Sequence, residues 1–192
     1  MGGRSWLNYF IKSCVELEDE GDCDGKEWTE FMGNVLDRVA DKMDCYVVRR
    51  RTKKKEESGE YLNIDAIFIG NVEYDLIEPK ENGWDPFVLP RAVVELENSY
   101  KINKISYCLW KILCIRSPMR VLVCYQSNKK NVRVLKKGLE KVIWNGSLMK
   151  GTDGDLLIII GNDSAKTEDW GKYFTVFEWR NHRLEKVEGL SW

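Results

Sequence analysis

The sequence predicts an α/β fold in which a central mixed β-sheet is flanked by helices. Three observations support this prediction. The chain has 192 residues, of which 43% are hydrophobic and 32% charged, and this is typical of a globular protein with a single buried core. Segments with apolar residues at helical spacing are interspersed with short, nearly continuous apolar runs, which are typical of strands buried on both faces. Neither a linker nor a repeat interrupts the chain, so we expect one domain over residues 1–192.

The individual elements follow from the same patterns. Apolar residues recur every three or four positions in the predicted helices, whereas the predicted strands are short apolar runs bounded by Gly, Pro and Asn. Pro118 fits the first position of a strand, because proline cannot donate a hydrogen bond within a sheet. In chain order we predict helices over 5–17 and 26–43, strands over 45–50, 61–70 and 73–79, a strand beginning at Ala92, a helix over 99–115, a strand over 118–126, a helix over 128–144, a strand over 155–161 and a hairpin over 172–187 that turns at Asn181 and His182.

Two carboxylates follow the most apolar of these strands. Glu95 and Glu97 come directly after Ala92-Val93-Val94, and side chains two residues apart on a strand point to the same face. Their charges repel each other, and a divalent cation would offset that repulsion. A third oxygen ligand is expected from a neighbouring strand. Asp65 is our first choice because its neighbours are apolar, and Asp75 is the rival.

These residues resemble the PD-(D/E)xK nuclease superfamily, whose restriction-endonuclease-like core has the order αβββαβ. The resemblance covers residues 26–126 and leaves 127–192 as an additional helix and strands. It implies Mg²⁺- or Mn²⁺-dependent hydrolysis of phosphodiester bonds, with Asp65 and Glu95 as metal ligands. Glu97 holds the position usually given to lysine, as in the ExE variants of the family. A carboxylate of the first core helix often completes such sites, and Glu27 is the candidate here, although a glutamate in a first turn also suits the helix dipole.

The missing lysine has three candidate replacements in the helix that follows. Lys101 and Lys104 are neighbours on one helix face just after Glu97, and Lys111 lies near the same face. Each would contact the scissile phosphate or position the attacking water. The alternative is a solvated helix face with no role in catalysis.

Basic residues in two segments suggest nucleic acid as the partner, because clustered Lys and Arg follow a phosphate backbone. The first cluster is formed by Arg49, Arg50, Arg51, Lys53, Lys54 and Lys55. The second is formed by Lys129, Lys130, Arg133, Lys136, Lys137 and Lys141. The resemblance favours DNA over RNA, and it leaves a homodimer open, since nucleases that cut both strands are often dimers.

Composition argues against several other classes of protein. The six cysteines form no CxxC pair and the only histidine is His182, which argues against a zinc site and a histidine-dependent triad. No apolar run reaches the ~20 residues needed to span a bilayer, and the first ten residues lack a signal-peptide core. We therefore expect a cytoplasmic protein with reduced cysteines and no membrane partner.

Two other functions fit the same residues. The chain could be a catalytically inactive module that binds nucleic acid or protein on the same fold, which the missing lysine favours. It could also be a structural or regulatory protein whose clustered acids bind a basic partner.

Overall fold

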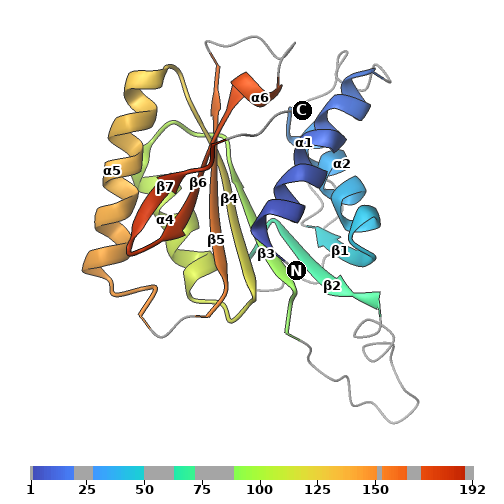
Figure 1. The fold of residues 1–192 in the computed structure, drawn as a ribbon, viewed down its shortest axis with the longest axis horizontal. Coiled ribbons are helices and arrows are strands. Elements are labelled where there is room, and N and C mark those ends of the chain that lie inside the picture. The colour runs from blue at the N-terminus through green and yellow to red at the C-terminus, as the bar shows by residue number, and fades with distance from the viewer. Residues whose placement is uncertain are drawn as a thin grey trace. The chain divides into compact units, whose positions relative to one another are not determined.

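The computed structural model describes residues 2–19, 28–49, 63–71, 89–150, 153–163 and 170–188. The chain forms two compact units, Met1–Ala92 and Val93–Trp192. Both units combine helices with strands (Figure 1), which confirms the α/β class. None of the helices in the described ranges has the length and apolar character that crossing a membrane requires.

The first unit consists of a helix pair and an antiparallel strand pair. The core is aromatic: Trp6 stacks on Phe10 with ring centroids 5.3 Å apart and meets Phe68 edge-on at 6.3 Å. The two predicted helices and the first predicted strand are confirmed within a few residues at their ends. The elements are α1 (Gly3–Asp19), α2 (Trp28–Lys42), β1 (Cys45–Arg49) and β2 (Ala66–Gly70).

The second predicted strand is shorter than expected. β2 begins at Ala66, so Asp65 lies in a bend just before the strand. Asn63 explains the difference, because its φ of 58° is left-handed and interrupts an extended chain. The predicted strand over 73–79, which contains Asp75, lies outside the described residues.

The second unit contains the mixed part of the sheet, with strands in the order β3-β4-β5-β6-β7. β3, β4 and β5 are parallel, and β6 and β7 continue the sheet antiparallel. The restriction-endonuclease-like arrangement of the whole chain stays a prediction. The elements are β3 (Ala92–Glu97), α4 (Ile102–Leu113), β4 (Met119–Gln126), α5 (Lys129–Asn145), β5 (Asp155–Asn162), α6 (Trp170–Tyr173), β6 (Phe174–Arg180) and β7 (Arg183–Lys186).

The two long helices of this unit lie on the same face of its sheet. Right-handed crossovers between neighbouring parallel strands that advance in one direction place their helices on one side, and Figure 1 shows this arrangement for α4 and α5. The helices touch where Ile102 of α4 meets Gly138 of α5: a Cβ added to Gly138 would come within 2.6 Å of Cδ1 of Ile102. The carboxyl ends of β3, β4 and β5 consequently meet at one edge of the sheet.

A buried arginine fixes the end of the first crossover. Arg120 is 2% exposed, and its guanidinium donates twice to the carbonyl of Ile115, at 3.1 and 2.9 Å, and once to that of Asp153, at 3.2 Å. The first two hydrogen bonds satisfy the carbonyl of Ile115 just after α4, where no helical partner is available. The third satisfies the carbonyl of Asp153 just before β5.

The terminal hairpin turns where the sequence predicted. Asn181 and His182 have φ values of 49° and 62°, the left-handed pair that a two-residue hairpin turn with matching twist needs. Tyr173, Phe174 and Phe177 are buried, so the aromatic residues at the start of this hairpin belong to the core.

Gly154, directly before the last parallel strand, has a φ of +105° and allows a test of the second unit. A Cβ at this position would lie 2.3 Å from the carbonyl oxygen of Pro118, which accepts the N–H of Asp155 at 2.8 Å. Gly154→Ala should therefore lower the free energy of unfolding by about 1–3 kcal/mol, measured by urea denaturation. Gly2→Ala is the control, because no atom lies within 4 Å of its added Cβ. Equal effects of the two substitutions would contradict the prediction.

Candidate functional site

The predicted carboxylate pair stands at the carboxyl end of β3, and its first member is deeply buried. Glu95 is 1% exposed, whereas Glu97 is half-buried. The strand reaches this point through Ala92, Val93 and Val94, all fully buried, so Glu95 is embedded among apolar groups. A carboxylate buried in this way requires a partner of opposite charge.

Lys111 of α4 is that partner. Its Nζ atom lies 2.7 Å from Oε1 of Glu95, and the lysine side chain is 15% exposed. The same ammonium lies 5.6 Å from the ring centroid of Tyr107, one turn earlier in α4, a distance at which a cation is attracted to an aromatic face. Lys111 thus contacts both the buried carboxylate of Glu95 and the ring of Tyr107 on the outer surface of the helix.

Glu97 is held by two weaker donors. Its Oε1 accepts the backbone N–H of Ser99 at 2.7 Å, and its Oε2 accepts the thiol of Cys108 at 3.7 Å. Burial raises the pKa of the Cys108 thiol, and the nearby Glu95 and Glu97 carboxylates raise it further. A raised pKa keeps the thiol protonated, and in this form it donates to Glu97.

The three lysines proposed from the sequence have different environments. Lys101 and Lys104 are exposed at the start of α4, and the lysine in contact with Glu95 is Lys111. Two helical turns separate Lys104 from Lys111, which places them along the same side of α4. The structure therefore brings Glu95, Glu97 and Lys111 together.

The remaining predicted ligands belong to other parts of the chain. Asp65 belongs to the first unit and is half-buried in the bend before β2, and its convergence with Glu95 and Glu97 stays a prediction. Glu27 and Asp75 lie outside the described residues. In the part of the chain that the structure describes, no three His, Cys, Asp or Glu side chains gather closely enough to hold a metal ion. Two carboxylates do match Mg²⁺, which is usually held by one or two of them together with waters and phosphate oxygens.

A polar cluster that the sequence did not indicate lies at the same edge of the sheet. Asp163, just after β5, accepts hydrogen bonds from the hydroxyls of Tyr100 and Tyr173, the latter at 2.8 Å. The bond to Asp163 raises the pKa of Tyr100. Gln126, the last residue of β4, donates to the carbonyl of Tyr100 at 3.4 Å. In open α/β sheets, ligands bind outside the carboxyl ends of the strands, and this cluster surrounds that region of the second unit.

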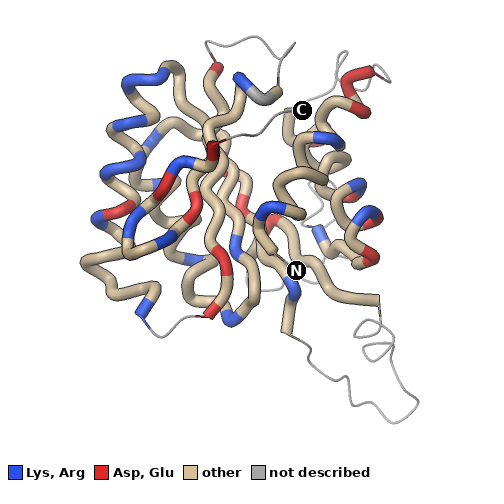
Figure 2. Tube along the Cα trace, in the orientation of Figure 1, with Lys and Arg blue, Asp and Glu red and all other residues tan. Residues whose placement is uncertain are grey.

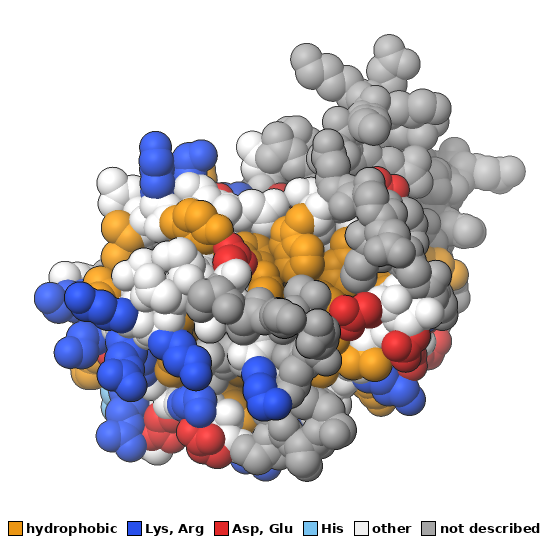
Figure 3. Space-filling view, turned by 90° about the horizontal axis from the view of Figure 1, so that it is seen from above, with side chains coloured by type: hydrophobic (Ala, Val, Ile, Leu, Met, Phe, Trp, Pro, Cys, Tyr) orange, Lys and Arg blue, Asp and Glu red, His pale blue; other side chains and the backbone are white. Residues whose placement is uncertain are grey.

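The two basic clusters predicted from the sequence have different environments. Arg49 forms an ion pair with Asp37 of α2, which offsets its charge, and the other five residues of the first cluster, Arg50, Arg51, Lys53, Lys54 and Lys55, lie outside the described residues. The second cluster follows α5 (Figure 2), and the view from above shows Lys and Arg side chains gathered where α5 lies (Figure 3). The residues of α5 with exposed basic side chains are Lys129, Lys130, Arg133, Lys137 and Lys141.

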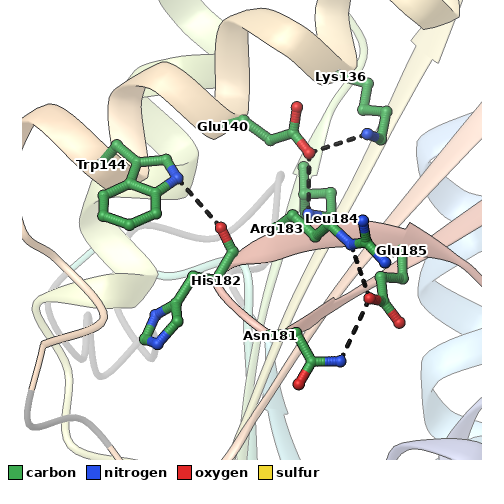
Figure 4. A network of polar contacts seen from close by, with 8 residues as sticks. All are labelled: Lys136, Glu140, Trp144, Asn181, His182, Arg183, Leu184 and Glu185. Atoms are coloured by element: carbon green, nitrogen blue, oxygen red, sulfur yellow. Dashed lines mark hydrogen bonds and ion pairs between the residues drawn. The ribbon is translucent and has the colours of Figure 1, made fainter.

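One flank of α5 contacts the terminal hairpin (Figure 4). Glu140 accepts both the ammonium of Lys136 at 2.8 Å and the backbone N–H of Leu184 at 2.9 Å. Trp144 donates its indole N–H to the carbonyl of His182 at 3.1 Å. Because these contacts use the flank of α5 that faces the hairpin, the exposed lysines are left directed to solvent.

In the comparison with known proteins, no family model and no curated protein sequence matches the chain.

Proposed function

We propose that this protein is a metal-dependent nuclease whose site includes Glu95, Glu97 and Lys111. The observation that carries the proposal is the 2.7 Å contact between Lys111 and the buried carboxylate of Glu95, beside a second carboxylate on the same strand. Two carboxylates and an ammonium at one strand end are the groups that phosphodiester hydrolysis uses: oxygen ligands for a cation and a positive charge for the phosphate.

The three side chains would have different roles. Glu97 is the more accessible carboxylate and would be the first ligand that a cation meets, with Glu95 behind it. Lys111 holds Glu95 in place and supplies the positive charge that the glutamate at position 97 does not. A bound Mg²⁺ would lower the pKa of a coordinated water and neutralise charge on the phosphate. We propose Asp65 as the third ligand of the site.

The exposed lysines and arginine of α5 support nucleic acid as the substrate. Glu140 forms its ion pair with Lys136 on the other flank of the helix, and not with these exposed residues. A row of such cations along one helix follows the phosphates of a bound strand and makes binding depend on salt.

The direct test is incubation with labelled single-stranded and duplex DNA and RNA in the presence of Mg²⁺, Mn²⁺ or EDTA. We expect cleavage with either metal and none with the chelator, because removing the cation removes both the activated water and the charge stabilisation. Cleavage that persists in EDTA, or intact substrates under every condition with a folded protein, would contradict the proposal.

A catalytically inactive binding module is the second candidate, and one observation favours it. Glu95 is 1% exposed and its charge is already offset by Lys111, so the pair is stable without a metal ion. In that case Mg²⁺ should change neither the tryptophan fluorescence nor the melting temperature, while nucleic acid still binds. A nuclease of the kind proposed should respond to Mg²⁺ in both measurements.

A further inference from the structure

The outer face of α4 carries two large aromatic side chains that the site described above does not use. Tyr107 is 59% and Trp110 is 47% exposed. Their rings stack on each other with centroids 5.8 Å apart and an angle of 24° between their planes. Because the rings face each other, each covers one face of the other, and the exposed Trp110 presents its outer face to solvent. We call the stacked pair the aromatic platform.

Positive charge borders this platform along one side. Tyr107 is three residues after Lys104 and four before Lys111, and side chains at these spacings are neighbours on a helix. Lys111 contacts the face of Tyr107 at 5.6 Å and also contacts Glu95 at 2.7 Å. The aromatic pair is therefore linked to the carboxylate site through a single side chain.

Exposed aromatic rings beside lysines fit one kind of ligand better than others. Bases stack on exposed aromatic rings only when they are unpaired, and the adjoining lysines match the phosphates of the same strand. In a duplex the base faces are stacked on one another inside the helix, so only the lysines would find a partner. An apolar protein surface would use the rings and offer no negative charge to Lys104.

We propose that an unpaired base stacks on the outer face of Trp110, which Tyr107 supports from the other side, and that the substrate of this protein is single-stranded nucleic acid. The choice of nucleic acid rests on the proposed function, whereas the preference for single strands rests on the aromatic pair. A strand stacked on this pair has its phosphates beside Lys111, one side chain away from Glu95.

The test is a binding measurement in EDTA, where the proposed cleavage does not occur. The probe is fluorescein-labelled oligo(dT) of about 20 nucleotides, longer than the sites of typical single-strand binding domains, and its anisotropy is compared with that of a duplex of equal length. We expect tighter binding of the single strand. Trp110→Ala should weaken that binding roughly 5- to 100-fold and leave duplex binding unchanged.

Trp144→Ala is the matched control. Trp144 is also an exposed tryptophan of the second unit, at 58%, but it lies on α5 against the hairpin. Its replacement should change oligo(dT) affinity by no more than about twofold. Trp110→Phe should retain most of the affinity, because it keeps an aromatic ring, and thermal melting verifies that each variant is folded.

Several results would overturn the inference. Equal affinity for single strand and duplex, unchanged by Trp110→Ala, would show that the platform does not contact bases. If Trp110→Ala altered the oligomeric state and not the affinity, the pair would be a contact between protein chains. Tight, Trp110-dependent binding without cleavage in Mg²⁺ would contradict the proposed nuclease and leave this inference intact, so the two failures are distinguishable.

Discussion

Replacing Glu95 by glutamine should reduce cleavage at least about a hundredfold, the scale on which loss of one charge-stabilising group slows catalysis. The amide is uncharged and binds a divalent cation poorly. The fold should survive, because glutamine has the same shape as glutamate and keeps a polar group beside the ammonium of Lys111, which lies 2.7 Å from Oε1 of Glu95. The rate of cleavage in Mg²⁺ is compared with that of the parent well below both melting temperatures.

Glu178→Gln provides the matched control for this experiment. Glu178 is also a buried carboxylate on a strand of the second unit, and it pairs with Arg180 at 2.7 Å. It lies on β6, outside the proposed site, so its replacement should leave cleavage unchanged. A Glu95→Gln variant that still cuts at the parental rate would show that the carboxylate serves the fold alone.

Local sequence patterns are sufficient to predict an element whose structure depends on its own residues alone. The helix predicted over 128–144 is α5, Lys129–Asn145, and its start is set by Asn128, whose side chain accepts the N–H of Asn131 at 3.0 Å. The hairpin turn at Asn181 and His182 is equally local. The strand over 61–70 was predicted too long because its apolar composition did not reveal the left-handed Asn63.

The contacts of the site depend on packing between segments, and the sequence could not supply them. The two glutamates were found because the apolar run before them identifies a buried strand. Lys111 is only one of three candidate lysines in the sequence, and Lys101 and Lys104 lie nearer to Glu97 along the chain. Which lysine meets Glu95 depends on how α4 crosses the sheet. The stacking of Tyr107 on Trp110 likewise depends on side-chain conformations that no spacing reveals.

Replacing Lys111 by methionine should be the most destabilising of the substitutions at this site. Methionine fills a similar volume and leaves the 1% exposed carboxylate of Glu95 without its counter-charge. Removing one partner of a buried ion pair costs about 3–5 kcal/mol. We expect the lower end of this range, because the Lys111 side chain is 15% exposed and water reaches part of the pair. Urea denaturation of the variant and the parent measures the difference in the free energy of unfolding.

Two further variants separate the ion pair from the lysine itself. Lys104→Met removes an exposed lysine from the same side of the same helix and should change stability by no more than about 0.5 kcal/mol. The double variant Glu95→Met/Lys111→Met replaces both charges by apolar groups of similar volume, and such replacements are often neutral or stabilising. It should therefore be more stable than Lys111→Met alone, although it removes one more native side chain. If Lys111→Met were no more destabilising than Lys104→Met, or if the double variant were less stable than Lys111→Met, the ion pair of Glu95 and Lys111 would not stabilise this strand end. The expected order would instead show that Glu95 is tolerated beside Glu97 because Lys111 offsets its charge before any cation binds.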